Sequence, residues 1–303
     1  MCGNEVNVPE LPEVETVKRG LEPVLMGRRF SWIELRRKDL RFPFPDGMTE
    51  TMQDAKVEAL ERRAKYILVH CSNGKTLILH LGMTGRFTIV KPDGKSFEPG
   101  AFYHDSGGNT EPGPHDHVIW HLDDGTCIVY NDARRFGFMD WADTQSLDKH
   151  KLLKDIGVEP LGNGFHTGHL VDKLRDKKAP MKAALLDQHV VAGLGNIYVS
   201  EALHRARISP KLEAGRMVKS KGTDPRLEHL VRHIKNILNE AILAGGSTLQ
   251  DFQGTSGEKG VFQQRFLVYD REGESCYTPE CSSVIKRIAQ SGRSTFYCPT
   301  CQK

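Results

Sequence analysis

Four cysteines near the C-terminus form two closely spaced pairs, and this spacing constrains the fold more than any other stretch of the sequence. Four residues separate Cys276 from Cys281, sixteen residues follow, and two residues separate Cys298 from Cys301. Four thiolates in two such pairs can complete the tetrahedral coordination of one Zn²⁺. Residues 270–303 contain few large apolar side chains. We therefore expect one structural zinc ion to supply much of their folding energy, with two strands and a turn between the pairs.

Two other interpretations of these cysteines stay open at this point, namely four unrelated thiols or an iron–sulfur site. The first pair is spaced more loosely than the usual two-residue knuckle. The chain has seven cysteines, and an odd number without a secretion signal argues against a disulfide framework. The remaining three, Cys2, Cys71 and Cys127, are expected to be one exposed thiol and two ordinary core thiols.

The length and charge of the chain exclude few functions. Its 303 residues suffice for two or three domains. The net charge of +3 does not demand a polyanionic partner, so any basic surface must come from clustering of Lys and Arg. No apolar run approaches the ~20 residues of a membrane helix, and residues 1–8 lack the basic start and apolar core of a signal peptide. A cytoplasmic protein without a membrane partner is expected.

The first half of the chain has the pattern of short β-strands separated by turns. Strand-like runs occupy residues 66–71, 76–81, 86–90, 117–122 and 126–130. Residues 92–116 contain five glycines and four prolines, and they are predicted to form a long surface loop. Several short strands with turns between them indicate a sandwich or a barrel.

The second half is mainly helical. Helical periodicity is found at residues 170–174, 181–187, 197–206 and 227–243. The last of these is followed by Gly245 and Gly246, a helix-stop signal. A strand-like run, 266–269, precedes the cysteines. The pattern predicts an α+β protein of several domains.

A proline–glutamate pair lies near the start, in the sequence Pro-Glu-Leu-Pro-Glu-Val-Glu of residues 9–15. A proline at an N-terminus carries a secondary amine, which can attack a sugar C1′ and collapse to an iminium. The neighbouring Glu10 could supply the proton for such a step. Pro-Glu pairs are common, however, and Pro12 also suits the first turn of a helix. Taken alone, the motif decides nothing.

Other residues would suit contact with a nucleic acid. Arg134 and Phe136 follow a strand, and Met83 lies in a Gly-Met-Thr-Gly turn, so these side chains could enter a duplex in place of an extruded base. The helix that begins near Asn196 follows a Gly-Leu-Gly turn, and its N-terminal N–H groups could bind an anion. Clusters of Lys and Arg could neutralise phosphates. Each feature is more often a core residue or a solvated face.

In combination, these motifs resemble the bacterial formamidopyrimidine-DNA glycosylases (Fpg). The resemblance rests on seven motifs that occur in the family's order: residues 9–15, 63–66, 80–85, 115–118, 134–137, 193–198 and 295–301. It implies a bifunctional DNA glycosylase and AP lyase of base excision repair, which removes oxidised purines, chiefly 8-oxoguanine and formamidopyrimidines. It implies double-stranded DNA with oxidised bases or abasic sites as the partner of a monomeric enzyme.

The resemblance also implies the architecture. An N-terminal catalytic β-sandwich is expected over residues 9–145. A helix–two-turn–helix DNA-binding domain is expected over 150–262, with a base-pocket loop at 254–262. A zinc-finger β-hairpin is expected over 266–303, in which zinc is structural and no redox cofactor is needed.

Individual roles follow from the matched motifs. Pro9 corresponds to the family's nucleophile and Schiff-base former, and Glu10 to the acid that protonates during base loss and ring opening. Lys65 corresponds to a residue that assists β-elimination, and Arg293 to a phosphate contact tied to δ-elimination. The remaining matches are void-filling side chains, namely Met83, Arg134 and Phe136, and DNA or phosphate contacts, namely His115, Lys178, Lys182 and Asn196. The implied zinc ligands are the four paired cysteines.

Three departures from the family pattern stand out. The family begins Met-Pro-Glu, whereas eight residues precede Pro9 here, and behind them its nitrogen is an amide. We expect translation to begin at Val8, because GTG can serve as an initiator and methionine before proline is readily trimmed. Ala133 replaces the usual proline, a small loss of loop rigidity. Glu258 stands where a lysine is frequent, which bears on lesion preference.

Two alternative functions stay open. One is an endonuclease VIII-like glycosylase for oxidised pyrimidines, although Leu11 and residues 13–15 favour Fpg. The other is a zinc-dependent DNA-binding protein without catalysis, as would follow if Pro9 stays blocked.

Overall fold

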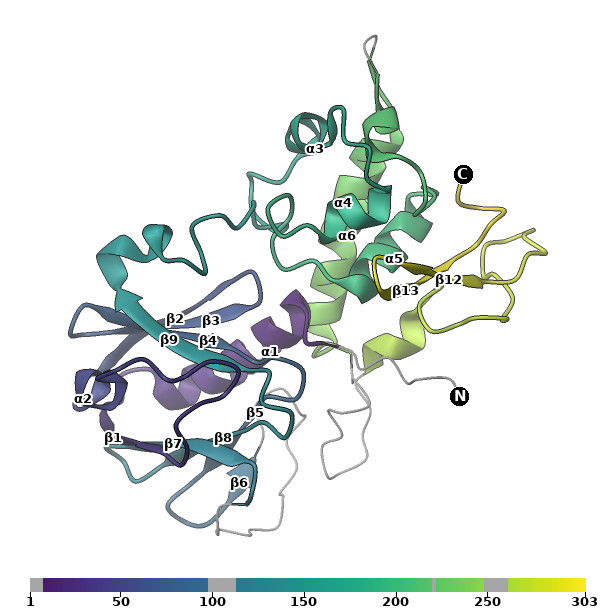
Figure 1. The fold of residues 1–303 in the computed structure, drawn as a ribbon. Coiled ribbons are helices and arrows are strands. Elements are labelled where there is room, and N and C mark those ends of the chain that lie inside the picture. The colour runs from purple at the N-terminus through teal and green to yellow at the C-terminus, as the bar shows by residue number, and fades with distance from the viewer. Residues whose placement is uncertain (1–7, 98–112, 220–221, 248–260) are drawn as a thin grey trace. The chain divides into compact units, whose positions relative to one another are not determined.

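The protein is described by a computed structural model that covers residues 8–97, 113–219, 222–247 and 261–303 (Figure 1). The chain divides into two compact units. The first combines Met1–Lys154 with Ala244–Val261, and the second combines Asp155–Leu243 with Phe262–Lys303. Most of the expected base-pocket loop and much of the expected surface loop at 92–116 lie outside the described residues.

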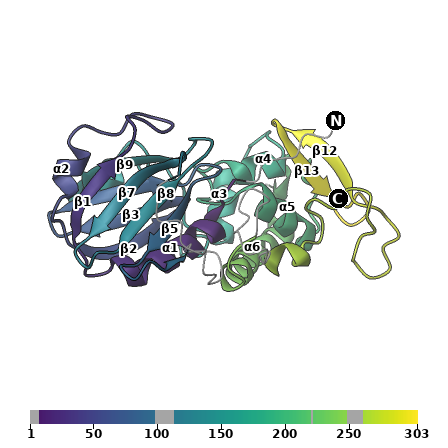
Figure 2. The same ribbon diagram turned by 90° about the horizontal axis from the view of Figure 1, so that it is seen from below.

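The described part of the first unit is a β-sandwich of two antiparallel sheets, as expected. One sheet has the strand order β1-β7-β8-β5-β6 and the other has the order β2-β3-β4-β9. Figure 2 shows these strands with helix α1 (Leu11–Leu25) along their edge. The strands are β1 (Phe30–Leu35), β2 (Val57–Arg63), β3 (Tyr66–Cys71), β4 (Lys75–His80), β5 (Arg86–Val90), β6 (Ser96–Phe97), β7 (Asp116–Leu122), β8 (Cys127–Asn131) and β9 (Phe138–Asp143).

The core of the sandwich is built by strand alternation. Every second residue of β5 and β8 is buried, because side chains of a strand point alternately to its two faces. Trp120 is fully buried, and its ring lies 5.6 Å from that of Phe30 and 5.2 Å from that of Phe87. The ring of Tyr130 lies 5.1 Å from that of Phe87. These rings fix the sheet from which the predicted DNA-contacting loops emerge.

Helix α1 (Leu11–Leu25) completes this core and carries the Pro-Glu motif at its start. Its apolar residues recur at helical spacing, and Val14, Val17 and Leu21 are buried in the sandwich core. Glu10 and Glu13 form a capping box at its N-terminus, with Pro12 in the first turn. Two further short helices lie in the first unit, α2 (Met48–Met52) and the 3₁₀ helix η1 (Thr144–Lys149).

The second unit contains a helical part and a β-hairpin. The helices are α3 (Thr167–Leu174), α4 (Met181–Leu186), α5 (Asn196–Arg205), α6 (Arg226–Leu243) and the 3₁₀ helices η2 (Ala214–Met217) and η3 (Val261–Arg265), the last crossing the boundary of the two units. The strands are β10 (Val218–Lys219), β11 (Gly222–Thr223), β12 (Lys286–Gln290) and β13 (Arg293–Tyr297). Among the described helices, none has the length and apolar character needed to cross a bilayer.

The predicted helices are confirmed, and α6 ends at Leu243 just before Gly245 and Gly246, both at positive φ. The predicted strand at residues 266–269 is wrong. Its backbone N–H groups at Leu267, Val268 and Tyr269 donate to the buried carboxylate of Glu201 on α5, at 2.8–2.9 Å, and no partner strand takes them. Apolar composition alone could not show this, because the acceptor lies more than 60 residues away in the sequence.

Substitution of Leu21 tests the packing of α1. Leu21 has no exposed surface, so Leu21→Ala should lower the free energy of unfolding by about 2–5 kcal/mol through lost burial and a residual cavity. Denaturant unfolding measures this. Met26→Ala is the control, because Met26 is 43% exposed and should change stability by no more than about 0.5 kcal/mol. Equal effects of the two substitutions would contradict the placement of α1 in the core.

Candidate functional site

The Pro-Glu motif lies at the entrance to α1. Pro9 is buried, and Glu10 is 3% exposed and serves as the N-cap residue. The backbone N–H of Glu10 donates to Oε2 of Glu13 at 3.0 Å. The first helical turn therefore fixes the backbone directly after the proline.

Glu13 links this turn to the residues that precede the base-pocket loop. Its Oε1 accepts hydrogen bonds from both the backbone N–H and the hydroxyl of Ser247, each at 2.8 Å. Gly246 packs against the same carboxylate with φ +86, where a Cβ would lie 3.2 Å from Oε1. One buried side chain thus joins the start of α1 to residues 246–247. Glu13 is part of the Pro-Glu motif, but no sequence pattern indicated this role.

Lys65 lies at the tip of the hairpin of β2 and β3. Arg63 pairs with Tyr66, so Ala64 and Lys65 form a two-residue turn in which Ala64 has φ +54. Burial, aided by the charge of Lys65, lowers the pKa of His80 to about 4. His80 is therefore neutral at physiological pH, and its Nδ1 accepts a hydrogen bond from the N–H of Gly82 at 3.1 Å. This holds the start of the Met83 turn beside the Lys65 hairpin.

The two predicted void-filling loops contact each other through glycine backbone. Gly82 has φ +68, and a Cβ there would collide with the backbone of Phe136 and Gly137. At the tips, Met83 is half-buried while Arg134 and Phe136 are exposed. The guanidinium of Arg134 lies 5.3 Å from the centre of the Phe136 ring. The structure thus places Met83, Arg134 and Phe136 on adjoining loops of the first unit.

His115 lies beside these loops, at the start of β7. Its side chain is exposed, and its ring centre is 6.4 Å from that of His117. The backbone carbonyl of His115 accepts a hydrogen bond from the N–H of Asp132, at 3.0 Å. His115 is therefore held by the same segment that carries Arg134 and Phe136.

In the second unit, three predicted DNA contacts gather at the start of β13. Arg293 is exposed and follows the turn Ser291-Gly292. The carbonyl of the next residue, Ser294, accepts hydrogen bonds from Lys182 Nζ at 2.7 Å and from Asn196 Nδ2 at 3.1 Å. Lys178, by contrast, is exposed and belongs to the segment before α4.

The position of Lys182 differs from the open surface expected of a phosphate contact. It is 1% exposed, and its Nζ also donates to Oγ1 of Thr295 at 2.6 Å. A buried ammonium group is tolerated where its protons are taken by such acceptors. Its described contacts hold the strand that carries Arg293.

Gln188 supports the glycine turn before α5, a role that no sequence pattern indicated. Its Oε1 accepts from the N–H of Gly193 at 2.8 Å, and its Nε2 donates to the carbonyl of Leu194 at 2.9 Å. The turn places Gly195 as N-cap residue and Asn196 as the first residue of α5. The N–H groups of this turn of helix suit an anion.

The four paired cysteines form a cluster whose geometry fits zinc. Their sulfur atoms all lie within 4.8 Å of one another. Cys276 and Cys301 are 3.9 Å apart, and Cys281 and Cys298 are 3.7 Å apart. A tetrahedral ion with Zn–S bonds of about 2.3 Å requires sulfur separations of about 3.8 Å. The hairpin of β12 and β13 lies between the two pairs in sequence, as expected.

The surroundings of Cys298 favour its thiolate form. Burial opposes ionisation of Cys298, but the N–H groups of Cys301 and Thr300 hold the pKa of its thiol at about 7. His204 of α5 lies with Nε2 3.7 Å from the sulfur of Cys276. The chemistry of the donor set thus matches a closed structural zinc site.

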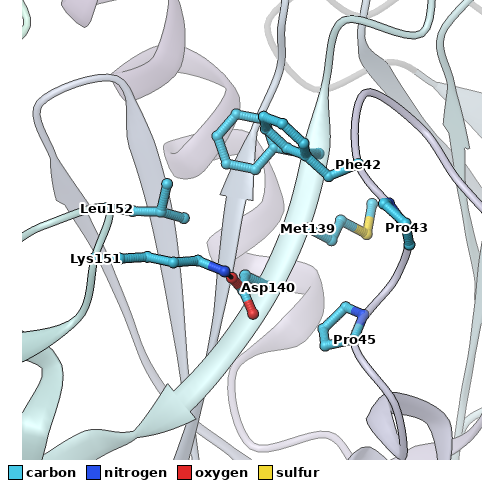
Figure 3. A pocket seen from close by; sticks show the side chains of 8 residues that line it. Phe42, Pro43, Pro45, Met139, Asp140, Lys151 and Leu152 are labelled. Atoms are coloured by element: carbon cyan, nitrogen blue, oxygen red, sulfur yellow. Dashed lines mark ion pairs between the residues drawn. The ribbon is translucent and has the colours of Figure 1, made fainter.

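An apolar pocket of about 390 Å³ lies elsewhere in the first unit (Figure 3). Phe42, Phe138 and Leu152 contribute to its wall, and Lys151 forms an ion pair of 3.0 Å with Asp140 at its rim. None of the predicted site residues lines it.

Comparison with known proteins assigns the chain to a family. The profile of the formamidopyrimidine-DNA glycosylase N-terminal domain matches residues 8–139, and that of its H2TH domain matches residues 156–253. A zinc-finger profile found in Fpg and IleRS matches residues 279–303. The Azorhizobium caulinodans formamidopyrimidine-DNA glycosylase is 51% identical over 297 residues, which cover 98% of this chain and 100% of that protein. The chain belongs to the formamidopyrimidine-DNA glycosylase family.

Other Fpg proteins agree with this assignment. The Methylobacterium sp. protein is 50% identical, with 97% of this chain and 99% of the relative covered. The crystal structure of Thermus thermophilus MutM (Fpg) is 34% identical with a TM-score of 0.78, covering 97% of this chain and 98% of that one. Lactococcus lactis Fpg in complex with DNA containing an abasic site is 31% identical with a TM-score of 0.81, covering 97% and 100%. The expected Fpg fold and single zinc site are thereby confirmed.

Loss of one cysteine tests the zinc site. Cys298→Ser should bring the zinc content from one ion per chain to near zero, because a serine hydroxyl is a poor replacement for a buried thiolate ligand. Elemental analysis of the purified protein measures this, with Cys71→Ser as the control outside the cluster. A variant that keeps one zinc ion per chain would show that the ligand set is wrong.

Proposed function

We propose that this Fpg-family chain is a bifunctional DNA glycosylase and AP lyase that excises oxidised purines through a Schiff base at Pro9. The observation that carries the proposal is the arrangement of Pro9 and Glu10 at the buried, capped entrance of α1. The family is named for an activity on formamidopyrimidine, and solved relatives bind DNA with an abasic site or with Fapy-dG. Its substrate is proposed to be double-stranded DNA that carries 8-oxoguanine, formamidopyrimidines or abasic sites.

The chemistry assigned to the motif begins with attack of the Pro9 nitrogen on C1′. The glycosidic bond breaks and the base leaves, with Glu10 supplying a proton during base loss and ring opening. The resulting iminium withdraws electrons and acidifies the C2′ proton. Loss of that proton expels the 3′ phosphate, and a second elimination expels the 5′ phosphate. Lys65 is proposed to assist the first elimination, and Arg293 is tied to the second.

The remaining site residues are proposed to act on the DNA. Met83, Arg134 and Phe136 would fill the space left by the extruded nucleotide, which offsets part of an extrusion cost of a few kcal/mol. His115, Lys178 and Asn196 would contact phosphates or DNA. Lys182 shares this interface by holding the carbonyl of Ser294, next to Arg293.

Two broader proposals accompany this function. The functional division is a catalytic sandwich at 9–145, a DNA-binding domain at 150–262 and a zinc-finger hairpin at 266–303. The enzyme is proposed to act as a monomer on the DNA of the bacterial cytoplasm, where its substrate lies.

The proposed reaction requires a free secondary amine at Pro9. An amide nitrogen shares its lone pair with the carbonyl group and cannot form the iminium. We therefore propose that Pro9 is the N-terminal residue of the active protein.

Borohydride trapping tests the function. Incubation with a duplex that carries 8-oxoguanine opposite cytosine should give a covalent protein–DNA complex, because borohydride reduces the iminium. Pro9→Gly removes the secondary amine and should abolish base excision while binding to an abasic analogue persists. Glu10→Gln should slow base release by about 10²–10⁴-fold through loss of the general acid, while binding to an abasic analogue persists.

The other outcomes decide between functions. Trapping only with thymine glycol opposite adenine would indicate an endonuclease VIII-like enzyme. No trapping, with retained DNA binding, would indicate a non-catalytic DNA-binding protein. Unchanged excision in both variants would refute the roles of Pro9 and Glu10.

The N-terminus can be checked by intact mass. The mass of active protein purified from its native host should not include residues 1–8, because only that form carries the proline amine. An active preparation whose mass includes residue 1 would contradict the proposal that Pro9 is the N-terminal residue.

A further inference from the structure

We infer that Asp132 is a positioning residue that sets the two void-filling loops as a single unit for base extrusion. This inference rests on the proposed function. Asp132 follows β8 and has no exposed surface. None of the roles assigned above involves Asp132.

The carboxylate of Asp132 connects both loops. Its Oδ1 accepts hydrogen bonds from the hydroxyl of Thr84 and from the N–H of Arg135, the latter at 3.1 Å. Its Oδ2 accepts from the N–H of Gly137 at 2.8 Å and from the hydroxyl of Tyr130 at 3.4 Å. Thr84 is the neighbour of Met83, and Arg135 and Gly137 flank Phe136.

Thr84 extends this connection to Arg134. Its Oγ1 donates to Asp132 and accepts the N–H of Arg134 at 3.1 Å. The hydroxyl therefore lies between the Met83 turn and the Arg134 loop. The backbone at Gly82 also approaches that of Phe136 and Gly137 so closely that a Cβ at Gly82 would collide with it.

The backbone of Asp132 reaches a further predicted DNA contact. Its N–H donates to the carbonyl of His115 at 3.0 Å, and its carbonyl oxygen lies 2.9 Å from Nε2 of His117. All four DNA-contacting residues proposed in the first unit, Met83, His115, Arg134 and Phe136, thus belong to segments that Asp132 bonds directly or through Thr84.

A carboxylate suits this position because both of its oxygen atoms accept hydrogen bonds and neither donates one. Buried backbone N–H groups require acceptors, and charge-assisted bonds to a carboxylate are the stronger kind. An asparagine of the same shape would present an NH₂ group to the N–H of either Arg135 or Gly137. One N–H of the loop would lose its carboxylate acceptor. The N–H of Arg135 would keep the backbone carbonyl of Asp132, at 3.2 Å, whereas no second acceptor is described for the N–H of Gly137. The loop positions would therefore change without a change in side-chain volume.

Asp132→Asn tests the role by comparing two substrates. Extrusion of a paired base must overcome pairing and stacking, whereas a preformed abasic nucleotide has no base to unpair. Excision of 8-oxoguanine opposite cytosine should fall about 30-fold in kcat/KM, while β-elimination at an abasic site in the same duplex falls less than about 3-fold. The rise in 2-aminopurine fluorescence next to the lesion, which follows extrusion, should slow in parallel.

Thr84→Val supplies a second variant that retains the carboxylate. It removes the hydroxyl between the loops at nearly constant volume and should give about a 5-fold loss on the paired lesion alone. The double variant should be no worse than Asp132→Asn, because both act through one unit. Asp140→Asn on β9 is the matched control and should leave both substrates unchanged; its carboxylate pairs with Lys151.

Equal losses on the paired lesion and the abasic site, or unaltered extrusion in both variants, would overturn the inference. If Asp132→Asn does not fold, Thr84→Val tests the inference through the same comparison of the paired lesion with the abasic site. Wild-type protein without either activity would refute the proposed function instead. In that case the role of Asp132 would be tested by the affinities of the variants for the 8-oxoguanine duplex. Affinities equal to that of the wild type would overturn this role.

Discussion

Asp132 lies without exposed surface beneath Arg134 and Phe136, and its carboxylate accepts two backbone N–H groups and two hydroxyls. A buried charge is costly unless every lone pair finds a donor, so the surrounding segments must adopt the conformation that supplies these donors. The conformation of the loops that carry Met83, Arg134 and Phe136 follows from this requirement. Gly82 and Gly137 then permit a backbone approach that any side chain would prevent.

Buried charged side chains also fix other segments that carry predicted functional residues. Glu201 accepts three successive N–H groups of residues 267–269, although burial raises the pKa of its carboxyl. Glu13 joins the turn that follows Pro9 to Ser247. Lys182 is the cationic counterpart, since its ammonium donates to Ser294 and Thr295 beside Arg293. For the three carboxylates, an irregular segment that could not satisfy its own backbone is fixed by a charged side chain of a regular element or its edge. Lys182 instead holds the start of strand β13. The zinc site serves the cysteine-bearing segment in the same sense, because few apolar side chains are available there.

Much of this architecture was predictable from local patterns. Short strand-like runs separated by turns predicted β3, β4, β5, β7 and β8, and helical spacing predicted α4, α5 and α6. The cysteine spacing predicted both the cluster and its hairpin. The prediction missed β1, β2 and β9, whose sequences mix charged residues with apolar ones. It also placed a strand at 266–269, where a distant carboxylate determines the backbone.

The sequence by itself determined the family, the order of the site motifs and the four cysteines that cluster, because these depend on residue types at fixed spacing. Only the tertiary structure showed that Lys182 is buried under the hairpin, that Glu13 reaches Ser247 and that Asp132 joins the loops of Met83, His115 and Arg134. The physical reason is that a buried polar side chain is defined by its partners. Those partners come from segments tens to hundreds of residues apart, and no local pattern specifies which of them will meet.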